Sequence, residues 1–146
     1  MVVSVLGCGR WGSFISWYLA GSGHSVTEWG RAEGKAFNEL KENGRNEYVE
    51  LDERINLTSD LEYAVMNSEA IVISIKSQSL REFAREIATY GAKDKKIILC
   101  MKGLEENTGK RLTEIMIEEG YDKDKTAVWV GPGHIQEFTR GKPNCM

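Results

Sequence analysis

Three glycines near the N-terminus have a spacing that suits phosphate binding. Gly7, Gly9 and Gly12 stand in the stretch GCGRWG, directly after the apolar run Val2 to Leu6. In a GxGxxG motif the first glycine allows a tight turn, the second lets the backbone approach a pyrophosphate, and the third lets a helix pack closely on a strand. A helix beginning here would offer free N–H groups to the phosphates. Because so short a motif also occurs by chance, its surroundings must decide whether it binds a dinucleotide.

The end of the second apolar run bears on which dinucleotide would bind. In the stretch VTEWGR the terminal strand position falls on Gly30, and Arg31 follows. An acidic residue at this position usually accepts hydrogen bonds from the ribose hydroxyls of NAD, whereas arginine suits the extra phosphate of NADP. The stretch therefore favours NADP(H), with NAD as the alternative. Glu28 would become the ribose ligand if the strand ended two residues earlier.

A regular alternation of β-rich runs and helical patterns would position these residues. The expected strands are Val2 to Leu6, His24 to Arg31, Ile55 to Leu57, Ala70 to Ile75, Lys96 to Met101 and Ala127 to Val130. The first helix is expected to carry one apolar stripe of Trp11, Phe14, Ile15, Tyr18 and Leu19. Such alternation is typical of βαβ units. The predicted fold class is therefore α/β, a Rossmann-type doubly wound, mainly parallel sheet with helices on both faces.

Composition excludes several other classes of protein. The chain has 146 residues, 41% of them hydrophobic, and a net charge of -3, which predicts one globular domain without a broad nucleic-acid surface. Its longest apolar run, Ala70 to Ile73, is too short to cross a membrane. Cys8, Cys100 and Cys145 show neither CxxC nor a Cys/His spacing, so no metal site or disulfide framework is expected. A cytoplasmic protein with reduced thiols is the simplest interpretation.

Five ordered segments carry a resemblance to a known family. They read GCGRWG, EWGR, SIKSQSLRE, CMKGLEENTG and VGPGHIQEFTRGKPNCM. Together they resemble the N-terminal domain of NAD(P)-dependent glycerol-3-phosphate dehydrogenases, over essentially the whole chain. That family reduces dihydroxyacetone phosphate to sn-glycerol 3-phosphate, reversibly, by hydride transfer. The resemblance implies NADP or NAD as the cofactor, of which Arg31 favours NADPH, and a small phosphate-bearing substrate.

The resemblance also implies roles for particular residues. Cofactor contacts fall on Gly7, Gly9, Arg10, Trp11, Gly12, Arg31, Lys102 and Ile135, and substrate contacts on Lys102, Gly131 and Gly133. Lys102 would stand at the carboxyl end of the fifth strand, the edge where open α/β sheets bind ligands. A lysine there can hold a phosphate or polarise a ketone oxygen. The alternatives are an exposed strand-end lysine for Lys102, a core residue for Trp11 and a solvated helix-start arginine for Arg31.

The chain departs from the family pattern at several positions. Gly133, His134 and Ile135 stand where members usually have Ser or Thr, then Phe, then Ala. A hydroxyl that would contact substrate is therefore missing, which leaves the substrate choice open. His134 could replace it as a donor or proton carrier, or serve structure alone. Lys76 replaces a proline after the fourth strand, where it either adds positive charge beside the cofactor edge or points to water, and Cys8 is interpreted as a substitute for alanine.

The resemblance places the family's essential lysine in a second, mostly helical domain beyond Met146. We therefore expect no catalytic residue here, and we expect residues 1–146 to be the dinucleotide-binding fragment of a longer enzyme, inactive alone. A homodimer of the full-length form stays open. The alternatives are a freestanding nucleotide-binding or redox-sensing module, and the cofactor domain of a related hydroxyacid or ketopantoate-type dehydrogenase.

Overall fold

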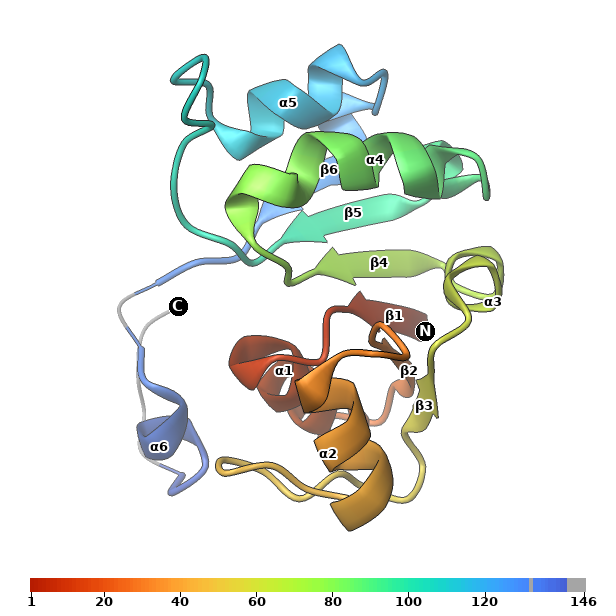
Figure 1. Cartoon of the computed structure of the whole chain (residues 1–146), viewed down its shortest axis with the longest axis vertical. Coiled ribbons are helices and arrows are strands. Elements are labelled where there is room, and N and C mark those ends of the chain that lie inside the picture. The colour runs from red at the N-terminus through yellow and green to blue at the C-terminus, as the bar shows by residue number, and fades with distance from the viewer. Residues whose placement is uncertain (132, 142–146) are drawn as a thin grey trace.

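The computed structural model describes residues 1–131 and 133–141 (Figure 1). Its strands are β1 (Val2–Leu6), β2 (Ser25–Trp29), β3 (Asn56–Thr58), β4 (Ala70–Ile73), β5 (Lys96–Leu99) and β6 (Thr126–Val128). Its α-helices are α1 (Arg10–Gly21), α2 (Lys35–Asn43), α3 (Leu61–Met66), α4 (Leu80–Ala88), α5 (Leu112–Glu118) and α6 (Ile135–Phe138). Three short 3₁₀ turns are η1 (Ser77–Ser79), η2 (Ala92–Asp94) and η3 (Lys123–Lys125).

All the strands described form one parallel sheet in the order β3-β2-β1-β4-β5-β6. The first strand lies in the middle, paired with β2 on one side and β4 on the other. The chain changes direction across the sheet between β1 and β4, and open α/β sheets bind ligands at such a point. The predicted doubly wound, parallel α/β fold is confirmed.

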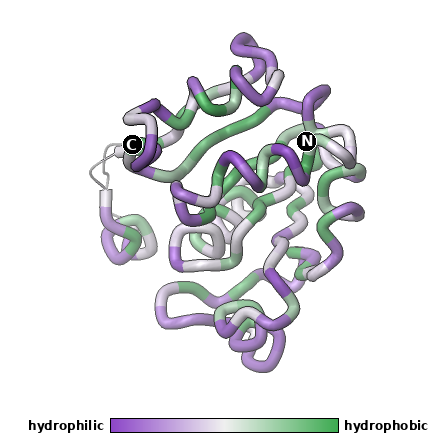
Figure 2. Tube along the Cα trace, turned by 45° about the horizontal axis from the view of Figure 1, so that its top comes forward, coloured by the Kyte–Doolittle hydropathy of each residue, from purple (hydrophilic) through white to green (hydrophobic). Residues whose placement is uncertain are grey.

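Helices cover both faces of the sheet and bury its apolar strands. On one face Phe14 and Ile15 of α1 pack against Val3 and Val5 of β1. On the other face α3, α4 and α5 bury a larger cluster that includes Leu6. The strands are the most apolar part of the tube, while hydrophilic residues gather along the outer helices and loops (Figure 2). The central strands β1 and β4 are buried almost throughout, which explains why apolar runs located them in the sequence.

Several predicted boundaries extend too far toward the carboxyl end. The strands expected over 24–31, 70–75 and 96–101 end at Trp29, Ile73 and Leu99. The residues just beyond are loop, because the chain leaves the sheet there to form the ligand edge. Tyr18, expected on the inward stripe of the first helix, is 45% exposed, and its ring lies between those of Phe14 and Trp129, at 6.2 and 6.3 Å between ring centres.

Three further points concern Cys145, membrane-spanning helices and clusters of metal-binding side chains. Cys145, expected to be a reduced thiol, lies outside the described residues. Within 1–131 and 133–141, no helix is long and apolar enough to cross a membrane. The same part of the chain contains no cluster of His, Cys, Asp and Glu able to hold a metal ion.

Candidate dinucleotide site

The three glycines of the turn after β1 do different things in the structure. Gly7 has φ +119°, and a Cβ on it would lie 2.2 Å from the carbonyl oxygen of Ser74. A Cβ on Gly12 would lie 1.6 Å from the carbonyl oxygen of Gly7, so α1 approaches the turn as closely as its backbone allows. A Cβ on Gly9 would meet no atom within 4 Å. Gly9 therefore faces open space at the N-terminus of α1, where a pyrophosphate would fit.

A cavity of about 480 Å³ opens at this edge of the sheet. Its walls come from the segments after β1, β4, β5 and β6, which lie 60 or more residues apart in places. In Figure 1, β4 and β5 end on the side where the segment leading to α6 passes. The lining includes five residues singled out in the sequence: Gly9, Arg10, Trp11, Lys102 and Gly131. Its size and mixed lining suit a cofactor.

Arg10 and Trp11 begin α1 at the mouth of the cavity. The Arg10 guanidinium lies 4.6 Å from the centre of the Tyr48 ring, and its Nη2 donates to Oε1 of Gln136 at 3.3 Å. The indole of Trp11 meets the ring of Phe14 edge to face. Trp11 therefore both lines the cavity and packs against the core, so the two interpretations of this residue are compatible.

Lys102 meets Gly131 across the far end of the cavity. The ammonium Nζ donates to the carbonyl oxygen of Gly131 at 2.8 Å. The following Gly103 has φ +119°, a conformation that favours glycine and turns the chain away from β5. The structure thus joins two residues predicted to bind substrate, and Nζ keeps two further N–H groups for a ligand.

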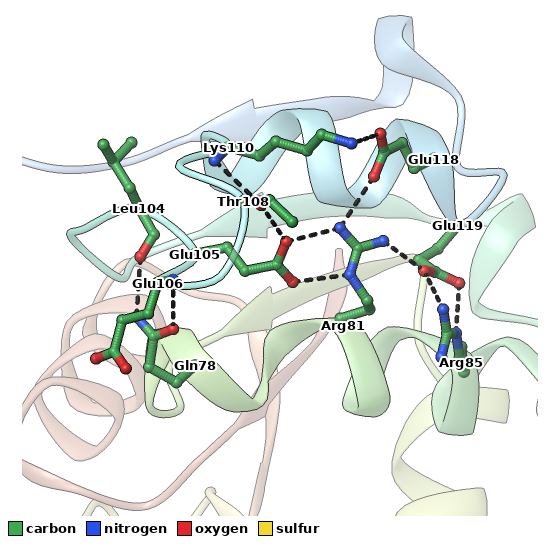
Figure 3. A network of polar contacts seen from close by, with 10 residues as sticks. All are labelled: Gln78, Arg81, Arg85, Leu104, Glu105, Glu106, Thr108, Lys110, Glu118 and Glu119. Atoms are coloured by element: carbon green, nitrogen blue, oxygen red, sulfur yellow. Dashed lines mark hydrogen bonds and ion pairs between the residues drawn. The ribbon is translucent and has the colours of Figure 1, made fainter.

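Side chains from η1 and from the start of α4 hold the loop that follows Lys102 (Figure 3). Gln78 Nε2 donates to the carbonyl oxygen of Leu104 at 2.9 Å, and its Oε1 accepts from the amide of Glu106 at 3.0 Å. Arg81 forms a two-point ion pair with Glu105 at 2.7 and 2.9 Å. The Arg81 guanidinium holds the pKa of the Glu105 carboxyl down at about 2.

The same arginine reaches α5 and ties it to α4 (Figure 3). Arg81 Nη1 lies 2.8 Å from Glu119, and Nη2 lies 2.9 Å from Glu118. Glu119 also binds Arg85 at 2.8 Å, and Lys110 pairs with Glu118. A bidentate, shared network of this kind contributes more than isolated surface pairs.

Glu28 does not lie at the ligand edge. It is fully buried in β2, with Oε1 accepting from Ser13 Oγ at 2.8 Å. Its alternative role as the ribose ligand is therefore wrong, because β2 continues to Trp29 and the carboxyl faces inward toward α1. Burial raises the pKa of this carboxyl to about 7.

The position after β2 has no room for an acidic side chain. A Cβ on Gly30 would lie 2.2 Å from Sγ of Cys8 and 2.9 Å from Cδ2 of Phe37. Arg31, the next residue, is exposed at the same edge, although it does not line the 480 Å³ cavity. The geometry agrees with the feature that favours NADP(H) in the sequence.

Gly133 and Ile135 do not line the cavity, and neither do Gly7, Gly12 and Arg31. Gly133 is buried, and Ile135 is fully buried in the cluster under α1. Helix α6 is fastened there by the stacked rings of Phe138 and Phe14, 5.4 Å apart. His134 is exposed immediately before α6. Ligand contacts of Gly133 and Ile135 stay predictions.

Sequence reasoning missed part of the cavity wall. The missed lining residues are Ile15, Ser74, Ile75, Ser77, Cys100, Met101, Trp129 and Val130, and Lys76 also lines it. Most of them follow directly after β4, β5 or β6, so their place at strand ends was an available signal. Tyr48, the ring beneath Arg10, lies in a segment without periodicity, and no local signal marks it.

The two described cysteines are protected thiols. Burial, and then the nearby Glu28, raise the pKa of Cys8 to about 11. Burial raises the pKa of Cys100 to about 12. Both therefore stay protonated at neutral pH, and a thiol in that state is a poor nucleophile. This disfavours a redox-sensing role for either of them.

A GxGxxG turn after the central strand of a parallel sheet, with a cavity at the carboxyl ends of its strands, defines a domain of the Rossmann type, the fold typical of dinucleotide binding. Comparison with known families makes this class specific. The family model described as NAD-dependent glycerol-3-phosphate dehydrogenase N-terminus matches residues 2–146, and the chain belongs to this family. The resemblance that the sequence motifs carry is confirmed over the whole chain.

Curated relatives agree with the family model. A protein of Moorella thermoacetica named glycerol-3-phosphate dehydrogenase (NAD(P)+) is 37% identical over 99% of this chain and 43% of its own length. One of the same name from Thermoanaerobacter sp. (strain X514) is 35% identical over 99% of this chain and 44% of its own length. The chain thus spans less than half the length of these relatives. The match favours this family over a hydroxyacid or ketopantoate-type dehydrogenase.

Solved structures support the fold. A glycerol-3-phosphate dehydrogenase of Coxiella burnetii matches 98% of this chain and 44% of its own with a TM-score of 0.83 and 23% identity. The corresponding enzyme of Plasmodium falciparum matches 96% of this chain and 43% of its own with a TM-score of 0.78 and 19% identity.

Proposed function

We propose that residues 1–146 bind NADPH, and NADH more weakly, as the cofactor domain of a glycerol-3-phosphate dehydrogenase. The observation that carries the proposal is the open space at Gly9, which exposes the amides at the start of α1 between tightly packed neighbours. In this proposal those amides hold the pyrophosphate, and Arg10 and Trp11 line its path. Arg31 pairs with the 2′-phosphate, because Cys8 leaves no room for an acidic ribose ligand at Gly30.

The far end of the cavity suits a small phosphate-bearing ketone. Lys102 is fixed by its bond to the Gly131 carbonyl, and the remaining N–H groups of its ammonium can bind a phosphate or the ketone oxygen. When bound, the nicotinamide supplies the hydride. Gly133 and Ile135, both buried in the segment that follows Gly131, remain predicted ligand contacts. For the longer protein we propose reduction of dihydroxyacetone phosphate to sn-glycerol 3-phosphate, in a cytoplasmic homodimer.

Isothermal titration calorimetry on the 146-residue chain tests the cofactor proposal. NADPH is expected to bind with one site per chain and more tightly than NADH, and Arg10→Ala is expected to weaken both. Lys41→Ala, a change on the distant helix α2, is the matched control for loss of a positive charge. Absence of binding by both dinucleotides to the folded chain would refute the proposal.

A further inference from the structure

A buried carboxyl lies one hydrogen bond from the phosphate-binding turn, and the proposed function does not use it. Glu28 accepts from Ser13 Oγ at 2.8 Å, and the same hydroxyl lies 3.3 Å from the carbonyl oxygen of Cys8. The amide of Ser13 donates to the carbonyl oxygen of Gly9 at 3.0 Å. Ser13 therefore links Glu28 to both Cys8 and Gly9 of the turn that would hold a pyrophosphate.

The surroundings of this carboxyl leave its charge unbalanced. Oε2 of Glu28 and Oγ of Ser16 are buried without a hydrogen-bond partner. Glu28 forms no ion pair within the part of the chain that the structure describes. The groups facing it are Ser13 and Ser16 of α1, the thiol of Cys8, and its register partners Val5 of β1 and Leu57 of β3. Cys8 is the other titratable group in this set, and it is neutral near pH 7.

An ionised Glu28 would oppose a second anion at the same helix end. A dinucleotide pyrophosphate carries two negative charges, and its repulsion from the buried Glu28 carboxylate is screened less than the repulsion between two fully exposed charges. Nearby negative charge disfavours the ionised form of a carboxyl. A protonated carboxyl carries no charge to oppose the pyrophosphate, and its O–H can donate to the hydroxyl oxygen of Ser16, whereas the same hydroxyl favours the ionised form when it donates to the carboxylate.

We propose that Glu28 is a positioning residue of the dinucleotide site, which takes up a proton when the pyrophosphate binds at the start of α1. The inference rests on the proposed function, since it needs a dinucleotide there. Burial puts the pKa of Glu28 at about 7 in the free protein, so the carboxyl is roughly half protonated at neutral pH. Below pH 7 most Glu28 carboxyls are neutral and do not repel the pyrophosphate. Above pH 7 most are ionised, and their negative charge opposes binding. Affinity therefore falls as the pH rises.

The expected size of the effect follows from linkage. If the bound phosphates raise the pKa of Glu28 by about one unit, binding at pH 7 takes up about 0.4 proton. The affinity then falls about fivefold between pH 6 and pH 8. If Glu28 had a purely structural role, removing its carboxyl would alter neither the number of protons taken up on binding nor the dependence of affinity on pH.

Calorimetry of NADPH binding to the 146-residue chain, in buffers of different ionisation enthalpy, measures the proton count. The 2′-phosphate of NADPH itself titrates near pH 6, so the Glu28 contribution is the difference between wild type and Glu28→Gln. This variant keeps the side-chain size and the acceptor for Ser13. We expect wild type to take up about 0.4 proton more at pH 7 than the variant. Ser13→Ala removes a bond that favours the ionised form, and should move maximal uptake to higher pH.

The outcomes separate this inference from the proposed function. Equal proton uptake by wild type and Glu28→Gln from pH 6 to 8, with both binding NADPH, overturns the inference and leaves the function standing. Absence of NADPH and NADH binding to folded wild type overturns both. If Glu28→Gln does not fold, Ser13→Ala decides, because an unchanged pH profile in that variant also overturns the inference.

Discussion

Replacing two glycines of the same motif by alanine should have opposite consequences. In Gly12→Ala the new Cβ would start 1.6 Å from the carbonyl oxygen of Gly7, so α1 and the turn must separate by more than about 1 Å. Because both partners are backbone, neither can move aside as a flexible side chain does. We expect the free energy of unfolding to fall by about 3 kcal/mol, which is the upper end of the usual range for adding a group to a tightly packed site. For a chain of this length that lowers Tm by roughly 10 °C.

Gly9→Ala adds the same methyl group where the structure has space. Gly9 has φ -76°, which alanine adopts without strain, and no atom lies within 4 Å of the new Cβ. A small loss at the helix cap is offset by reduced freedom of the unfolded chain, so stability should stay within about 0.5 kcal/mol of wild type. The methyl would instead occupy the place of the pyrophosphate. One lost bond to a charged phosphate, about 2 kcal/mol, weakens NADPH binding roughly 30-fold.

Urea unfolding and calorimetric NADPH titration of both variants measure the two quantities separately. The expected pattern is a stable Gly9→Ala that binds poorly and an unstable Gly12→Ala. Equal destabilisation by the two changes, or wild-type NADPH affinity in Gly9→Ala, would show that our assignment of the open space is incorrect.

Three further predictions concern charge and thiols. Arg31→Gln should weaken NADPH binding about tenfold or more and leave NADH unchanged in titration calorimetry, whereas an equal loss for both would contradict a 2′-phosphate contact. The lowered pKa of Glu105 means that its ion pair contributes stability above about pH 4.5, which is lost as the pH falls toward about 2. Arg81→Met should therefore reduce this acid-dependent stability in circular-dichroism titrations, and an unchanged profile would exclude it. Cys8 and Cys100 should resist iodoacetamide at pH 8 until the chain is unfolded, as peptide mapping by mass spectrometry would show, because their pKa values are about 11 and 12.

Local signals were sufficient for the architecture and for the centre of the site. The strand expected from Val2 to Leu6 has those bounds in the structure, because a strand buried on both faces is a continuous apolar run. Lys102 was placed at the carboxyl end of its strand, and parallel strands bring such ends to one edge. Its contact with Gly131 follows from that topology.

Features that depend on contacts between distant segments could not be predicted from local sequence signals. Tyr48 packs on Arg10 from a segment with no period, so nothing nearby in the chain marks it. The sequence places Glu28 either at the ligand edge, as the ribose ligand, or outside the site. Its buried position was missed because ionisable side chains are rarely buried inside a strand and because its partner Ser13 lies on another element. The four-residue helix α6 is too short for a periodic pattern, and its position comes from rings that stack on α1.

The cavity draws its walls from four separate stretches of chain between Gly9 and Gly131, so none of the four forms a binding site by itself. Ligand affinity is consequently tied to the cooperative folding of the entire sheet. A cofactor present at a hundred times its dissociation constant would add about 2.7 kcal/mol to stability. In a cell, a higher concentration of dinucleotide would therefore lengthen the lifetime of a variant with a weakened core before it is degraded by proteases.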